Sequence, residues 1–169
     1  MVRIRVPKRR RREGKTDYKL RLGLLKSGMP RIVIRKTNKY LIAQLVRTER
    51  ARDYVITSVS SRQLVKGTGI EGSAKSIPLA YFTGLLLGKK IKKLKDWASK
   101  EFILDLGMYR IIKGNRLFAL AKGLIDAGLK VRVDQNMFPS QERLMGEHLK
   151  PEVKSKLKEI KTKIENEWS

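Results

Sequence analysis

Residues 31–47 read RIVIRKTNKYLIAQLVR, and this stretch decides the fold. Two runs rich in β-branched and other apolar side chains, residues 31–35 and 40–47, flank the polar residues 37–39. Such runs favour extended strands and the polar residues between them favour a turn, so the stretch predicts a β-hairpin. Its lysines and arginines, Arg31 among them, are expected on the edges and the exposed face of the sheet.

Downstream of the hairpin, the pattern adds further strands. Residues 54–59, YVITSV, follow a charged loop over 49–52 and predict a third antiparallel strand. Residues 60–76 are rich in Gly and Ser and predict a loop. The short apolar run 101–106 predicts another strand beside the first three.

Helices are predicted between and after these strands. Pro78 suits the first turn of a helix over 78–98, which has an apolar stripe at spacings of three and four and is apolar all round in its first half. A GxxxG pair that starts at Gly84 predicts close packing of this helix on a sheet. A second helix is predicted over 116–127. The fold class is therefore α/β, with a small mixed, mainly antiparallel sheet packed with helices.

The C-terminal segment predicts an amphipathic helix that starts at Pro151. Its apolar side chains recur at spacings of four, three, four and four, and they are Val153, Leu157, Ile160, Ile164 and Trp168. We expect this stripe to dock on the chain's own body, with a partner protein as the alternative. The chain then divides into a basic N-terminal extension over 1–30, an α/β core over 31–135 and a C-terminal tail over 136–169.

The charge of the chain is large and unevenly placed. The 169 residues include 40 Lys and Arg against 16 Asp and Glu, a net charge of +24. Residues 1–95 hold 26 of the basic and only 5 of the acidic side chains, and residues 1–21 alone hold ten basic ones. These charges repel one another over about 8 Å at physiological salt, so we expect the arm to settle only against a polyanion.

Nucleic acid, an anionic membrane surface and an acidic protein are the candidate polyanions. A membrane-surface helix needs an apolar face, and residues 7–15 offer none. The arm is rich in Arg, whose planar guanidinium pairs with phosphate oxygens and stacks on bases, and this favours nucleic acid. A solvated tail or an import signal is the remaining interpretation.

Catalytic and cofactor motifs are weak. The absence of Cys excludes a thiolate nucleophile and a Cys-rich zinc site. Residues 67–72 spell GxGxxG, but the strand before them and the helix after them are too distant for a dinucleotide site. Asp105 and Asp126 do not amount to a metal site, and we expect Asp105 to accept hydrogen bonds near a strand end and Asp126 to be solvated. With His148 as the single histidine, we expect no enzyme, no cofactor, no metal and no small-molecule substrate.

Secretion and membrane insertion are not expected. The basic N-terminus is not followed by the apolar core of a signal peptide. The most apolar stretch, residues 77–87, is about half the length that a bilayer requires.

Five separated segments together resemble a known family. They are KRRRREGKTDYKLRLGLLKSGMPRIVIRKTNKYLIAQLV at 8–46, SIPLAYFTGLLLG at 76–88, FILDLG at 102–107, KGNRLFALAKGLIDAGL at 113–129 and ERLMGEHL at 142–149. In this order they are similar to the archaeal branch of the large-subunit ribosomal protein eighteen family, over about residues 5–150. The short loop at 49–52 departs from the family, so contacts of a longer loop cannot be transferred.

The resemblance implies an α/β domain that binds 5S rRNA in the central protuberance of the large ribosomal subunit and also touches 23S rRNA. It further implies cytoplasmic ribosomes as the location and a neighbouring 5S-binding ribosomal protein as a partner. Family matching places RNA contacts in the arm, the hairpin and the tail, at Arg9, Arg10, Arg11, Arg12, Lys15, Thr16, Asp17, Tyr18, Arg21, Arg35, Lys36, Thr37, Asn38, Lys39, Arg143, Gly146 and His148.

Further RNA contacts are expected at Lys8, Tyr40, Arg47, Lys113 and Arg116. Tyr18 and Tyr40 are candidates for stacking on unpaired bases, and packing within the protein is the equal alternative. Two other functions remain open on the residues alone: an RNA-processing nuclease that would use Asp105 or His148, and a DNA-compacting basic protein.

Overall fold

The computed structural model describes residues 6–50, 52–66, 68 and 74–167. Within them a five-stranded sheet runs in the order β3-β2-β1-β4-β5. The first three strands are antiparallel, and β4 and β5 continue the sheet parallel to β1, so the predicted α/β class with a mainly antiparallel sheet is confirmed. The strands are β1 Arg31–Lys36, β2 Leu41–Glu49, β3 Arg52–Ser60, β4 Glu101–Asp105 and β5 Lys130–Val131.

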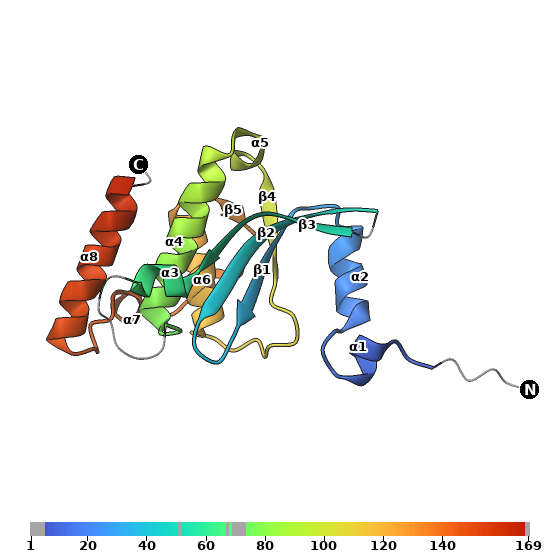
Figure 1. Ribbon diagram of the computed structural model, residues 1–169, viewed down its shortest axis with the longest axis horizontal. Helices are drawn as coiled ribbons and strands as arrows, with labels where there is room; N and C mark the ends of the chain where they lie inside the picture. Colours follow the sequence, from blue (N-terminus) through green and yellow to red (C-terminus); the bar gives the residue numbers. More distant parts are fainter. Residues whose placement is uncertain (1–5, 51, 67, 69–73, 168–169) are drawn as a thin grey trace, which may run out of the picture.

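Helices precede, connect and follow these strands. They are α1 Arg9–Arg12, α2 Tyr18–Lys26, α3 Ser61–Val65, α4 Ile77–Lys93, α5 Lys95–Ala98, α6 Arg116–Asp126, α7 Gln141–Met145 and α8 Pro151–Glu167, with a 3₁₀ turn at Gln135–Met137. Figure 1 shows α4, α6 and α8 on one side of the sheet and α1 and α2 on the other.

The predicted hairpin is confirmed, and its neighbourhood is more ordered than expected. Strands β2 and β3 extend into the expected charged loop until Glu49 pairs with Arg52. The predicted loop over 60–76 is wrong in its first part, since α3 begins there with its first turn capped by the Ser60 side chain. The GxGxxG prediction falls, apart from Thr68, outside the described residues.

The core lies between the sheet and the helices on the α4 side. Strand side chains alternate between the two faces, and those that point toward α4 are fully buried: Ile32, Ile34, Leu41, Ala43 and Leu45. The first half of α4 is buried all round, as predicted. The helix is shorter than expected, because it ends at Lys93 and leaves Leu94 36% exposed before α5.

Glycines set the close packing of α4 on α6. A Cβ on Gly84 would collide with the backbone carbonyl oxygen of Leu120, and one on Gly123 would collide with that of Tyr81. The sequence predicted close packing of α4 on a sheet, and this is wrong, since the glycines face another helix. Two helices with glycines at facing positions can bring their backbones together.

The terminal helix α8 docks on the chain's own body, as expected. Leu157, Ile160 and Ile164 are at most 4% exposed, and Lys89 Nζ donates to the carbonyl oxygen of Ile164 over 3.1 Å. Trp168 lies outside the described residues. Across the described part of the chain, the helices are all too short or too polar to span a membrane.

We expect Gly123→Ala to lower the free energy of unfolding by roughly 1 to 3 kcal/mol or more, because the new methyl group overpacks the α4–α6 contact. Gly23→Ala is the matched control: it lies inside α2 with nothing within 4 Å of its added Cβ. That change should stabilise the protein by about 0.5 to 1 kcal/mol through helix propensity. Urea denaturation of both variants measures the two effects, and equal stability would contradict the packing argument.

Candidate nucleic-acid interface

The basic arm folds into two short helices, which differs from the expectation that it settles only against a polyanion. Asp17 caps α2, because its Oδ1 accepts from the backbone N–H groups of Lys19 at 2.9 Å and Leu20 at 3.1 Å. Capping by Asp at this position satisfies amides that have no partner inside the helix. Asp17 therefore orders the start of α2, and its carboxylate is already engaged.

A network of ion pairs joins this arm to the face of the sheet opposite α4. Arg31 on β1 is 2% exposed, and its Nη1 donates to Asp105 Oδ2 at 2.8 Å. Its Nη2 donates to Asp53 Oδ1 at 2.7 Å and to Thr48 Oγ1 at 2.9 Å. The predicted exposure of Arg31 is wrong, because carboxylates from β3 and β4 surround its guanidinium.

Two further arginines share these carboxylates. Arg35 Nη2 donates to Asp105 Oδ1 at 2.9 Å, and Arg21 Nη2 on α2 donates to Asp53 Oδ2 at 2.7 Å. The positions follow from strand alternation, because Val33 pairs with Asp105 in the parallel β1–β4 ladder and lies between Arg31 and Arg35. The prediction that Asp105 accepts hydrogen bonds near a strand end is confirmed.

The electrostatics of Asp53 show how the network favours ionised groups. Burial acts to raise the pKa of Asp53, but the hydrogen bonds from Thr48 and Arg31 and the charges of Arg31 and Arg21 outweigh it. The pKa of Asp53 is therefore held below its usual value. A buried guanidinium is tolerated only when it is paired and hydrogen-bonded, and that condition is met here.

Within the described residues, no three His, Asp or Glu side chains gather in a way that could hold a metal ion. Asp126, expected to be solvated, is only part-exposed and accepts from Tyr81 Oη at 3.1 Å and Lys122 Nζ at 2.7 Å. Burial, with Asp126 beside it, raises the pKa of Tyr81. Asp126 is thus a structural contact between α6 and α4.

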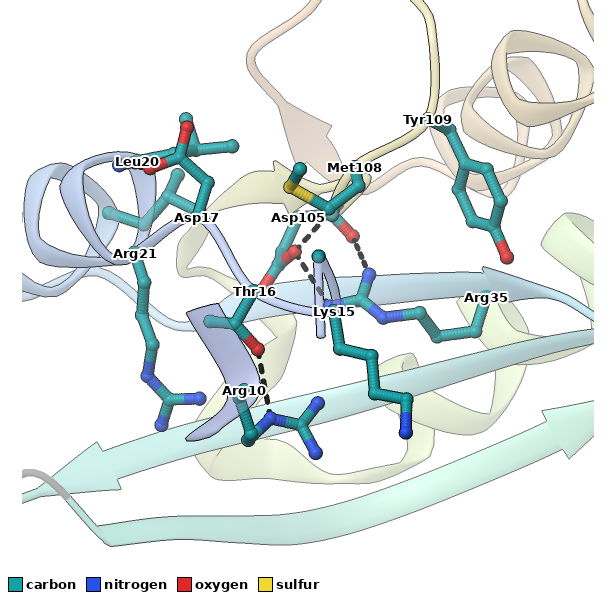
Figure 2. A pocket seen from close by; sticks show the side chains of 13 residues that line it. Arg10, Lys15, Thr16, Asp17, Leu20, Arg21, Arg35, Asp105, Met108 and Tyr109 are labelled. Carbon is teal, nitrogen blue, oxygen red and sulfur yellow. Dashed lines mark hydrogen bonds and ion pairs between the residues drawn. The ribbon is translucent and has the colours of Figure 1, made fainter. Parts of the chain in front are cut away.

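A cavity of about 260 Å³ lies where the arm meets the sheet. Figure 2 shows its walls, which come from the arm on one side and from the ends of β1 and β4 on the other. Its lining includes four predicted RNA-contacting cations, namely Arg10, Lys15, Arg21 and Arg35. Thr16 and Asp17 also line it, so the structure brings six of the predicted site residues together.

The basic side chains at residues 8–15 are exposed to solvent. Helix α1 buries no residue, and all four of its arginines, Arg9 to Arg12, are exposed. Arg10 Nε donates to Thr16 Oγ1 at 2.9 Å, and Lys15 Nζ pairs with Glu13 at 2.9 Å. Lys8 Nζ lies 4.8 Å from the centre of the half-buried Tyr18 ring. This part of the arm can accept phosphates without first breaking buried contacts.

The hairpin turn presents a second group of predicted residues. Thr37 Oγ1 donates to the Tyr40 carbonyl oxygen at 2.8 Å and accepts from the Tyr40 N–H at 3.0 Å, which fixes the turn. Lys36, Asn38 and Lys39 are exposed around it. Tyr40 is half-buried and packs against the core, which favours the packing interpretation of this side chain.

The other predicted residues lie away from the cavity. Arg47 is exposed on β2 and pairs with Glu49, while Lys113 and Arg116 stand before and at the start of α6. Arg143 and His148 are exposed on α7 and in the turn after it. Gly146 ends α7 with φ 77° and is buried, so its part is to form the turn.

Sequence reasoning missed Asp53, Gly107, Met108 and Tyr109. The signal for Asp53 was its rarity, since it is one of the five acidic residues among 26 basic ones in residues 1–95. Each such acid is a candidate partner for a buried arginine. The loop residues 107–109 offered no comparable signal, because their place depends on where β4 ends.

The chain is similar in sequence to ribosomal proteins of the large subunit. A family model described as ribosomal large subunit proteins 60S L5 and 50S L18 matches residues 2–102. A large ribosomal subunit protein uL18 of Caldivirga maquilingensis is 44% identical over 147 residues, covering 87% of this chain and 70% of that protein. One of the same name from Methanococcus maripaludis is 46% identical over 149 residues, covering 88% and 75%.

We expect Asp105→Asn to lower the free energy of unfolding by about 3 to 5 kcal/mol, because it leaves buried Arg31 with one carboxylate fewer. Glu101→Gln on the same strand is the matched control, since its ion pair with Arg132 is exposed. That control should leave stability almost unchanged. Equal midpoints of chemical denaturation for the two variants would contradict the role given to Asp105.

Proposed function

Because the chain belongs to the family of ribosomal large subunit proteins 60S L5 and 50S L18, we propose that it binds 5S rRNA and helps attach it to 23S rRNA in the central protuberance. The membership makes it a structural component of the large ribosomal subunit, and so of the cytoplasm. A neighbouring 5S-binding ribosomal protein is the protein partner in this proposal.

The observation that supports RNA binding most strongly is the presentation of the arm. Four consecutive exposed arginines stand on α1, next to a cavity lined by further cations. Such a surface attracts phosphate, and Arg adds planar hydrogen-bonding geometry. The arm is also held on the sheet by the Arg21–Asp53 ion pair, so its cations keep a fixed relation to the hairpin turn.

Recognition would then rest on the shape of the RNA. The arm and the exposed Lys36, Asn38 and Lys39 form two separated groups of contacts, and these fit backbone positions that only a folded RNA holds at the right spacing. The deep major groove of A-form RNA hides its base edges from side chains, which favours shape and unpaired bases as the source of selectivity.

A catalytic role has little in its favour. An RNA-processing nuclease would need the Asp105 carboxylate for a metal ion or a proton, but both of its oxygens accept from arginines. His148 is exposed at a different part of the molecule, on the turn after α7. We therefore propose a structural role without catalysis.

The salt dependence of 5S rRNA binding tests the proposal. If about half of the arm's cations neutralise phosphates, the slope of log K against log salt has a size near 4, and affinity falls roughly 10²- to 10³-fold between 50 and 200 mM salt. Replacing Arg9, Arg10, Arg11 and Arg12 by Ala should flatten this slope by about 3 units. Filter binding or fluorescence anisotropy across a salt series measures it.

The matched control removes four exposed lysines from the tail: Lys150, Lys158, Lys161 and Lys163. It changes the net charge equally but should leave the slope near that of the unaltered chain. Equal slopes for both variants would contradict the arm as the binding element. Competition with duplex DNA at one salt concentration separates the proposal from a DNA-compacting function, which predicts no preference for 5S rRNA.

A further inference from the structure

We propose that the cavity between the arm and the sheet receives one unpaired nucleotide of the bound RNA. The inference rests on the proposed function, because it assigns part of the RNA to a defined place on the protein. One wall of the cavity, the arm wall, includes Arg10, Lys15, Thr16, Leu20 and Arg21. The opposite wall, the core wall, includes Arg35, Asp105, Gly107, Met108 and Tyr109. Figure 2 labels side chains of both walls, among them Arg10 and Thr16 from the arm and Arg35 and Tyr109 from the core.

The size of the cavity suits a small planar group. Its volume of about 260 Å³ lies just below the roughly 300 to 1,000 Å³ of sites that enclose drug-sized ligands. It is only partly enclosed, so a base can enter while its sugar and phosphate stay outside and remain joined to the RNA chain. A whole helical segment of RNA does not fit such a space.

The charge of the lining favours an anion at the mouth. The two carboxylates in the wall are already satisfied, because Asp17 accepts from the amides of α2 and Asp105 accepts from Arg31 and Arg35. Within the described residues, the terminal amino groups of Arg10 have no hydrogen-bond acceptor, while its Nε is anchored on Thr16. In the view of Figure 2 the charged ends of Arg10 and Lys15 point to the same side. A flanking phosphate can bind there.

The core wall offers two flat groups that are already fixed. The Arg35 guanidinium donates to the carbonyl oxygen of Ile34 at 2.9 Å and to that of Asp105 at 2.7 Å, besides its ion pair with the Asp105 carboxylate. Tyr109 Oη donates to the Lys36 carbonyl oxygen at 2.6 Å and accepts from the Lys36 N–H at 3.1 Å. Unpaired bases stack on aromatic rings and on guanidinium planes.

Gly107 makes the guanidinium wall possible. Its φ of 63° is a conformation that side chains disfavour, and an added Cβ would lie 3.2 Å from Arg35 Cζ. Only glycine lets the chain turn here while Arg35 lies against it. Together, the fixed planes and the anchored cations form a site for one base and its phosphate.

Filling the cavity without changing charge tests this inference. Met108→Trp fills it from the core and Leu20→Trp from the arm, and both side chains are exposed, at 57% and 46%, so neither change should affect folding. Each should weaken 5S rRNA binding roughly tenfold or more, since one base stack is lost. The salt slope should stay that of the unaltered chain, because all cations remain.

The matched controls are Ile111→Trp in the same loop as Met108 and Leu22→Trp on α2, which are exposed and do not line this cavity. They should bind within about twofold of the unaltered chain. Chemical probing of base edges gives a second measure. One unpaired nucleotide of the RNA should be protected by the unaltered chain and by both controls, and become reactive with both filling variants.

Two outcomes overturn the cavity site. The first is that both filling variants bind and protect the RNA like the unaltered chain. The second is that the controls lose as much affinity as the filling variants. The proposed function fails separately, when the unaltered chain shows no preference for 5S rRNA over duplex DNA, so the two failures can be told apart.

Discussion

The buried guanidinium of Arg31 is the constraint on which the arrangement of this protein depends. It lies on the central strand β1 and is only 2% exposed. The charge must be neutralised there, because burying an unpaired charge away from water would strongly destabilise the fold. Asp105 from the end of β4 and Asp53 from β3 supply the two carboxylates. Each carboxylate then binds a second arginine, Arg35 on the sheet and Arg21 on the arm. One buried charge thus joins three strands and the arm.

This constraint explains how a strongly self-repelling arm can lie in a defined place. The arm's cations repel one another within about 8 Å. Two carboxylates oppose this repulsion, because Asp17 caps the start of α2 and Asp53 on β3 pairs with Arg21. Salt screens buried or partly buried pairs much less than exposed ones. We therefore expect salt to release phosphates from α1 while leaving α2 docked, which separates binding of the RNA from folding of the protein.

Local sequence patterns predicted the long helices of the core, but they could not predict which distant residues form ion pairs. The stripes of α4, α6 and α8 repeat every three or four residues, so their existence and buried faces could be read directly. Helix α2 was not predicted, because it has no such stripe and buries none of its residues, and Asp17 before Tyr18 is the only local signal for its start. Arg31 looked exposed because its partner Asp105 is 74 residues away and comes near only through the parallel β1–β4 pairing.

The candidate site was also predictable only in part. The arm and hairpin cations were predictable from charge and from the family resemblance, and six of the predicted residues line one cavity. The cavity itself was not predictable, since its core wall depends on the turn at Gly107 and on the hydrogen bonds of Tyr109 to Lys36. Gly84 was recognised as a site of close approach, but the pattern does not say whether a helix or a sheet approaches.

Ion pairs hold the arm on the sheet before any RNA is bound. Hydrogen exchange of the α2 amides in the free protein, measured with and without Asp53→Asn, tests it most directly. In the unaltered chain we predict that the amides of residues 21–25 exchange more slowly than those of an unstructured peptide. In the variant they should exchange roughly tenfold faster or more, because the charged hydrogen bond between Arg21 and Asp53, worth about 1.5 to 3 kcal/mol, is lost. Exchange at the rate of an unstructured peptide in the unaltered chain would contradict the account.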